Sequence, residues 1–169
     1  EDIRAAVNRI YGEESKQLEI PDLVHFASWV GGDMDGNPNV HAKTIRATLA
    51  RQRSLILDLY FKECAAISAK LSQSVDCATF SQGMLDKIED YRGIFQNAYH
   101  AVPARHREMP YRVFLRLIQQ RLQSTYDEDI YPYEKVEQLI EDIELIAESL
   151  SCNKGRHAGL FAVRRLLRR

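Results

Sequence analysis

Cysteine, long apolar runs and net charge are scarce in this chain of 169 residues, and each scarcity excludes a class of protein. The three cysteines, Cys64, Cys77 and Cys152, are odd in number and form no CxxC pair, so a disulfide scaffold is not expected. No apolar run approaches the ~20 residues that a membrane-spanning helix requires. The formal net charge of -1 gives no reason to expect nucleic acid or a membrane surface as a partner. These features favour a reduced, cytoplasmic protein.

The composition is that of a globular protein with a core, at 45% hydrophobic and 28% charged residues. The chain starts at Glu1 without a methionine or an apolar leader, and it stops at Arg169 within a helical pattern. We therefore expect residues 1–169 to be a single internal segment of a longer polypeptide.

The first 40 residues are expected to hold a short helix, a strand and a glycine-rich loop. Ile3, Val7 and Ile10 follow helical spacing over residues 2–11, and Gly12 would end that helix. Residues 23–30 are almost continuously apolar and stop at a Gly-Gly pair, which is typical of a strand buried on both faces.

Residues 41–169 are helical in pattern. Apolar residues at helical spacing predict about five helices: from Asn37-Pro38 to about residue 72, over residues 81–99, from Pro110, after Pro132, and from about residue 155. The fold class is therefore mainly α with one buried strand. Because a lone strand cannot satisfy its backbone polar groups, its partner strands must come from chain outside these residues.

The segment from Gly31 to Pro38 is the most unusual stretch, with three glycines in six residues. The simplest interpretation is a structural turn. A calcium loop is excluded, because Pro38 stands where that loop needs glycine and Thr44 stands where it needs glutamate. Glycine spacing also excludes a P-loop and a GxGxxG fingerprint. A strand end leading into a helix N-terminus is, however, where (β/α) barrels hold active sites and where anions bind.

Residues 28–40, read S-W-V-G-G-D-M-D-G-N-P-N-V, resemble the signature S-W-M-G-G-D-R-D-G-N-P-N-V of the phosphoenolpyruvate carboxylase family. The chain departs at Val30, a mild change, and at Met34, where the family has arginine. Weaker similarity continues downstream at Ala42, Arg46, Asp58-Leu59-Tyr60, Lys62, Leu71-Ser72, Pro110-Tyr111-Arg112 and residues 160–169. The likeness spans nearly the whole chain, although only its first part is highly specific.

The resemblance implies a segment excised from an α/β-barrel enzyme with many helices, assembled as a homotetramer. Such enzymes carboxylate phosphoenolpyruvate with bicarbonate, using Mg²⁺ or Mn²⁺, and supply oxaloacetate to the tricarboxylic acid cycle. The family's catalytic histidine motif T-x-H-P-T, its mobile loop F-H-G-R-G-G and its metal-binding carboxylates are absent here. The segment alone is therefore expected to be inactive, and to hold no catalytic residue and no metal.

The resemblance gives this segment one wall of the substrate pocket. Trp29 is expected to line the apolar part of that pocket, with burial in the barrel interior as the simpler alternative. The active-site loop would consist of Gly31, Gly32, Asp33, Asp35, Gly36 and Asn37, which shape the loop and transfer no protons. If the family's arginine makes an ion pair from this loop, that pair cannot form with Met34.

Other charged residues give weaker signals. The five histidines show no metal-ligand spacing. The basic cluster of Arg164, Arg165, Arg168 and Arg169 is expected to be a solvent- or partner-facing helix side. The acidic run over residues 133–148 is expected to be a solvated helix face. An alternative function from another class is a non-catalytic helical interaction or regulatory module of the same ancestry.

Overall fold

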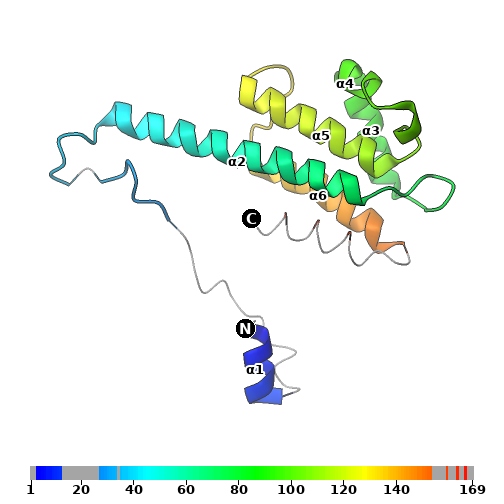
Figure 1. Ribbon diagram of the computed structural model, residues 1–169, viewed down its shortest axis with the longest axis horizontal. Coiled ribbons are helices and arrows are strands. Elements are labelled where there is room, and N and C mark those ends of the chain that lie inside the picture. Colours follow the sequence, from blue (N-terminus) through cyan, green and yellow to red (C-terminus); the bar gives the residue numbers. More distant parts are fainter. Residues whose placement is uncertain are drawn as a thin grey trace. The chain divides into compact units, whose positions relative to one another are not determined.

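The computed structural model describes residues 3–12, 27–33 and 35–153, together with residues 159, 163 and 166. Its elements are α1 (Ile3–Tyr11), α2 (Ala42–Lys70), α3 (Gln82–Ile94), α4 (Gln96–His100), the 3₁₀ turn η2 (Ala104–His106), α5 (Pro110–Asp127) and α6 (Val136–Ser151) (Figure 1). The mainly α class is confirmed. The chain divides into two compact units, residues 1–48 and 49–169. Among the described helices, none combines the length and the apolarity that crossing a bilayer requires.

The first unit confirms the short N-terminal helix but not the strand. Helix α1 is followed by Gly12 at a φ of 61°, the left-handed conformation expected of a glycine that ends a helix. Residues 23–26 of the predicted strand lie outside the described residues. Residues 27–30 are irregular and turn-like, so the prediction is wrong for this part of it. A strand needs a hydrogen-bonded neighbour, and none of the described residues pairs with this segment.

Helix α2 begins four residues later than the Asn37-Pro38 pair predicts. The Asn37 side chain accepts a hydrogen bond from the Asn39 N–H at 3.0 Å, and its carbonyl accepts one from Val40 at 3.1 Å. This side-chain-supported turn competes with a helix start, as Asn side chains commonly do. At the actual start, the ring nitrogen Nδ1 of His41 accepts from the Thr44 N–H at 3.4 Å. His41 therefore occupies the capping position expected for Asn37.

The second unit is a helical bundle whose directions follow from paired contacts. Arg53 on α2 donates to the Thr125 carbonyl on α5, and Gln119 on α5 donates to the Phe61 carbonyl on α2. Residue numbers rise on one helix as they fall on the other, so α2 and α5 are antiparallel neighbours (Figure 1). The same reasoning makes α6 antiparallel to α5 and to α3.

Helix α5 is the central element of the bundle. Apolar side chains at helical spacing are fully buried along it, including Phe114, Leu117 and Ile118. Pro110 occupies its first turn, where a missing N–H costs nothing, as predicted. Buried residues of α2, α3 and α6 pack around it, among them Ile67, Met84, Tyr91, Ile143 and Ile146.

Two other predicted helices are confirmed with changes. The helix expected over residues 81–99 is split into α3 and α4 by Phe95, whose φ of −107° and ψ of 52° are not helical. In the helix expected from about residue 155, Gly159, Val163 and Leu166 are helical, and Val163 and Leu166 are buried. The four arginines of the C-terminal basic cluster lie outside the described residues.

Arg112 ties the C-terminal end of α2 to the start of α5. Its Nε donates to the carbonyls of Ser68 at 3.1 Å and Leu71 at 3.2 Å, which have no partner within the helix. Its Nη1 lies 2.8 Å from Nε2 of His106. Partial burial, then Arg112 and Arg105, lower the pKa of His106, so the neutral ring can accept from the guanidinium.

Candidate functional site

The glycine-rich loop of residues 27–40 is the predicted site, and its first half is a tight turn. The Gly32 N–H donates to the Trp29 carbonyl at 3.1 Å, which closes the turn over residues 29–32. Gly31 within it has a φ of 73°, in the left-handed region that side chains disfavour. The local conformation therefore explains the presence of glycine at position 31.

Gly31 is required for a second reason, because the loop passes close to α2. A Cβ atom at this position would lie 2.1 Å from Oγ1 and 2.8 Å from Cβ of Thr48. Any side chain at position 31 would therefore displace either the loop or the second turn of α2. Backbone conformation and packing both specify glycine.

The second half of the loop is more open. Gly36 has a φ of 71°, but a Cβ there would meet nothing within 4 Å. Asn37 orders the chain through its bond to Asn39, as described above. Asp33 is half-buried and Asp35 is exposed. Met34 lies outside the described residues, so the consequence of its replacing the family arginine stays a prediction.

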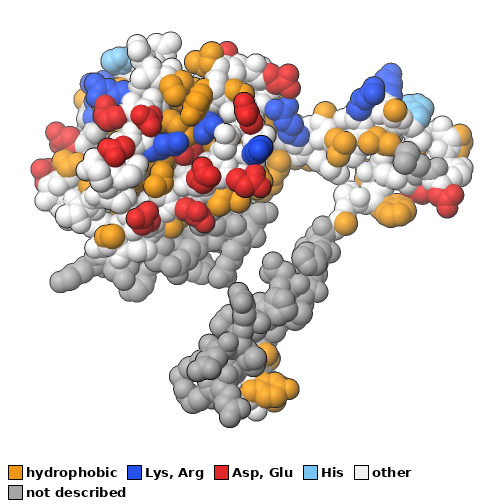
Figure 2. All heavy atoms as spheres, turned by 180° about the vertical axis from the view of Figure 1, so that it is seen from behind, with side chains coloured by type: hydrophobic (Ala, Val, Ile, Leu, Met, Phe, Trp, Pro, Cys, Tyr) orange, Lys and Arg blue, Asp and Glu red, His pale blue; other side chains and the backbone are white. Residues whose placement is uncertain are grey.

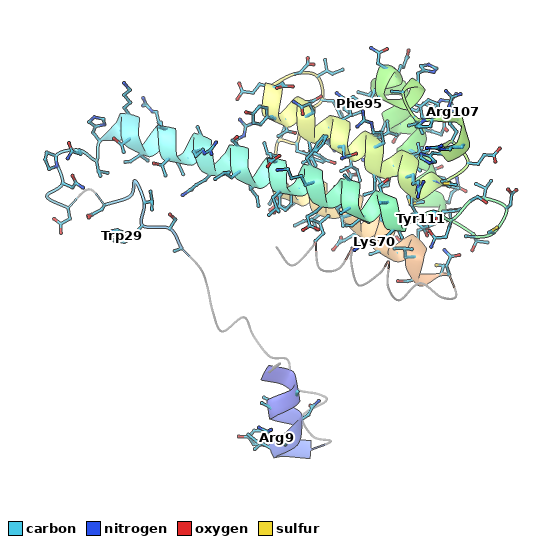
Figure 3. All side chains as sticks on the ribbon, viewed as in Figure 1. Arg9, Trp29, Lys70, Phe95, Arg107 and Tyr111 are labelled. Carbon is cyan, nitrogen blue, oxygen red and sulfur yellow. The ribbon has the colours of Figure 1, made fainter. Side chains whose placement is uncertain are left out.

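Trp29 is exposed on this loop, which precedes α2 (Figure 3). Its exposed fraction is 76%, and that of the neighbouring Val30 is the same. An indole at this exposure presents a large apolar surface to whatever lies next to it. Within the described residues the loop thus has the backbone of a tight turn, while the side chains of Trp29 and Val30 are largely uncovered.

The described residues contain no group of three or more His, Cys, Asp or Glu side chains that could hold a metal ion. The three cysteines are free thiols, Cys64 buried and the other two exposed. Burial, with smaller effects of Glu63 and Asp142, raises the pKa of the Cys64 thiol to about 12, so it is not a reactive thiolate.

A buried polar cluster around Asp142 was not predicted. We expected the acidic run over residues 133–148 to be a solvated helix face, which is wrong for Asp142, exposed by only 1%. Its Oδ2 accepts hydrogen bonds from the hydroxyls of Tyr91 at 2.6 Å and Tyr133 at 2.5 Å. Nη1 of Arg121 lies 3.7 Å from the same oxygen. Buried charges are found paired in this way because desolvation is costly.

Arg121 connects this cluster to the segment between α5 and α6. Its Nη1 donates to the Tyr91 hydroxyl at 2.5 Å, its Nε to the Tyr131 carbonyl at 3.3 Å, and its Nη2 to Gln138 Oε1 at 3.2 Å. The guanidinium carbon also lies 4.0 Å from the ring centre of Tyr133 and 4.4 Å from that of Tyr131. Tyr131 has a φ of 51°, an uncommon conformation for an aromatic residue that these contacts hold in place.

The electrostatics of the cluster follow from burial. Burial raises the pKa of Asp142, and the hydrogen bonds from Tyr133 and Tyr91 oppose that rise. Burial and the nearby Asp142 raise the pKa values of both tyrosines well above the usual range, so both hydroxyls are protonated donors. The cluster is enclosed by α3, α5 and α6. It is a structural clamp, since its four side chains are buried.

A sequence signal for this clamp exists. Asp142 lies three residues after Leu139 and four before Ile146, on the buried stripe of α6. Arg121 lies three residues after Ile118 on the buried stripe of α5. An acidic residue on one apolar stripe and a basic residue on another indicate a buried ion pair. The acidic run taken as a whole suggests a solvent-exposed helix face instead.

Comparisons with known proteins agree with the family resemblance of the loop sequence. The family model described as "Phosphoenolpyruvate carboxylase" matches residues 1–169. The chain belongs to the phosphoenolpyruvate carboxylase family. Proteins named phosphoenolpyruvate carboxylase from Xanthomonas oryzae pv. oryzae and Xanthomonas euvesicatoria pv. vesicatoria are 43% and 44% identical to it over 167 residues. A protein of the same name from Prochlorococcus marinus subsp. pastoris is 32% identical over 127 residues, 74% of this chain and 13% of that protein.

The match to the phosphoenolpyruvate carboxylase family is nearly complete for the chain but partial for its relatives. The Xanthomonas alignments cover 99% of this chain and 18% of each relative. The chain thus spans about a fifth of the length of those relatives. No solved structure matches it at a significant level.

Proposed function

We propose that this chain is part of an enzyme that carboxylates phosphoenolpyruvate with bicarbonate to give oxaloacetate and phosphate. The observation that carries the proposal is the family match over residues 1–169, which includes the loop whose turn requires Gly31. The loop contributes one wall of the substrate pocket, and the remaining walls come from the rest of the polypeptide. The product would supply the tricarboxylic acid cycle.

The reaction explains why an apolar wall is needed. Bicarbonate attacks the phosphoryl group, which breaks the bond from phosphorus to the enol oxygen and gives carboxyphosphate and the enolate of pyruvate. The enolate carbon then takes the carboxyl carbon of carboxyphosphate, whose C–O bond breaks to release phosphate. Water in the pocket would protonate the enolate instead, so the site must be dry at this stage. The exposed indole of Trp29 is suited to form part of such a wall once the pocket is complete.

The acidic residues of the loop have a shaping role in this proposal. Asp33 and Asp35 flank the loop's centre, and Gly36 and Asn37 lead the chain into the next turn. A divalent Mg²⁺ or Mn²⁺ ion would stabilise phosphate and enolate charge in the whole enzyme. The described residues do not fit such an ion, because they contain no group of three or more His, Cys, Asp or Glu side chains that could hold it. The whole enzyme is proposed to be a homotetramer in the cytoplasm.

The test replaces Trp29 in the full-length polypeptide that contains this segment. Trp29→Ala should lower kcat/KM for phosphoenolpyruvate by about tenfold or more, equivalent to ~1.4 kcal/mol of lost transition-state binding. Oxaloacetate formation is measured with Mg²⁺ and both substrates, and oligomeric state by size-exclusion chromatography. Val30→Ala is the matched control, because Val30 is as exposed as Trp29.

Three results would contradict parts of the proposal. A full-length wild-type protein that forms no oxaloacetate would refute the activity and favour a non-catalytic helical module. Equal kinetics for Trp29→Ala and wild type would remove Trp29 from the pocket wall. Turnover by the isolated 169-residue chain would show that the missing walls are not needed.

A further inference from the structure

A groove of about 420 Å³ lies between α2 and α5 in the second unit. Its apolar lining includes Leu55 and Phe61 from α2, and Leu122 and Tyr126 from α5. Two hydrogen bonds link the helices beside the groove. Arg53 donates to the Thr125 carbonyl at 2.7 Å, and Gln119 donates to the Phe61 carbonyl at 3.0 Å. Both hydrogen bonds join α2 directly to α5.

The groove exposes apolar side chains from both of its helices. Leu55 is 52% exposed and Tyr126 is 53% exposed, although both line the same depression. Figure 2 shows hydrophobic side chains at the surface of the helical unit among acidic and basic ones. Leu55 and Tyr126 thus offer half-exposed apolar side chains from two helices to one occupant of the groove.

The charges at the groove indicate what the occupant carries. Asp58 is already paired with Lys62 at 2.7 Å. Arg51 also lines the groove, and no ion pair joins it to another described residue. An occupant that matches this surface has an aliphatic or aromatic side chain for the groove and an acidic residue for Arg51.

We infer that the groove is occupied by a segment of the same polypeptide from outside residues 1–169, with an apolar side chain between Leu55 and Tyr126 and a carboxylate at Arg51. The inference rests on the proposed function, since it takes the chain to be one part of a full-length enzyme. This chain covers 18% of the Xanthomonas oryzae relative, so about four fifths of such a polypeptide is available to cover it. A covering segment would convert the exposed faces of α2 and α5 into an internal contact.

The experiment uses the full-length polypeptide with the photo-reactive residue p-benzoylphenylalanine replacing Leu55. The matched control carries the same residue in place of Val75, which is also 52% exposed but does not line the groove. After irradiation, a denaturing gel reports whether the product is one chain or two, and peptide mapping identifies the captured segment. The expected product from position 55 is a single chain joined to a peptide from outside residues 1–169. Peptide mapping should find an acidic residue in that peptide.

Three outcomes would overturn the inference. A product of two chains would assign the groove to a second copy. Capture only within residues 1–169, or no capture, would leave the groove without the proposed occupant. Capture of the same peptide from position 75 would show that the groove does not select it.

Two further variants separate the parts of the inference. Leu55→Asp should lower the melting temperature of the full-length protein more than Val75→Asp does, and equal shifts would overturn the apolar contact. Arg51→Glu should reduce capture from position 55, and an undiminished yield would overturn the charge contact. An oxaloacetate assay on the full-length wild-type protein keeps the two proposals apart, because capture from position 55 together with an inactive wild type would refute the activity alone.

Discussion

At the scale of single residues, Asp142 and Arg121 form a buried pair that charge patterning alone does not predict. Both are nearly completely buried, and their partners come from three helices and the segment before α6. Removing one partner of a buried pair leaves an uncompensated charge, which costs more than removing both. The two residues therefore act as a unit.

Asp142→Ala should lower the free energy of unfolding of the 169-residue chain by about 3–5 kcal/mol, because Arg121 is left buried without its carboxylate. Urea denaturation followed by circular dichroism measures the loss. The double variant Arg121→Met with Asp142→Leu should be less destabilised than Asp142→Ala. A double variant that is equally unstable would show that packing, rather than charge, dominates.

The pH dependence has a definite sign. Burial raises the folded pKa of Asp142 above its ordinary value of 3.8, so the folded state binds the proton more tightly than the unfolded state does. The associated stability is fully present below pH 3.8 and is lost as the pH rises through the folded pKa. Asp142→Asn should lack this component, which appears as a difference between the two stability curves in acid.

At the scale of elements, the loop and α2 are coupled through Gly31 and Thr48. Gly31→Ala places a Cβ against Thr48 and also puts a side chain on a residue with positive φ. Gly36→Ala has only the unfavourable positive φ, because its Cβ meets no other atom within 4 Å. A left-handed conformation costs a non-glycine residue ~1–2 kcal/mol. We expect faster amide hydrogen exchange at the start of α2 in Gly31→Ala than in Gly36→Ala. Equal exchange in both variants would mean that the close approach to Thr48 is unimportant.

The helices that the sequence predicts correctly are those with a long apolar stripe and a clear start. Helix α5 has both, since Pro110 opens it and a buried stripe runs along it. The predicted start of α2 is wrong because the Asn37 side chain supports a turn instead of capping the helix, and residue propensity does not distinguish the two roles. The break at Phe95 depends on tertiary packing, because Phe95 is itself buried among Tyr91 and Tyr131.

The candidate site was also predictable only in part, because some of its features are local and others depend on tertiary contacts. The turn around Gly31 follows from glycine's conformational freedom, and the contact with Thr48 could be known only from the structure. The strand predicted before the loop depends on partners that the described residues do not contain. The clamp around Asp142 was missed because we treated the acidic run as one solvent-exposed helix face. Helical periodicity places Asp142 of that run on the buried side of α6.

At the scale of the whole molecule, the two units are unequal in their cores. The buried apolar residues of the described chain run from Cys64 to Leu166, all within the unit of residues 49–169. Stability should therefore reside in that unit, because apolar burial is the main stabilising term in folding.

Deletion of residues 1–41 should consequently leave the melting temperature of the helical unit nearly unchanged. A shift of less than about 4 °C, equivalent to roughly 1 kcal/mol for a domain of this size, is expected. Thermal melts of the two chains by far-ultraviolet circular dichroism measure it. A larger decrease would show that the N-terminal residues contribute to the core.

The position of Trp29 has an optical consequence. It is the only tryptophan in the chain, and its indole is 76% exposed. Its fluorescence should be that of an indole in water, and it should change little while the bundle of residues 49–169 unfolds. The emission of this chain would then report the surroundings of the loop independently of the state of the helices. Ordering of the loop against a partner surface would appear as a blue shift.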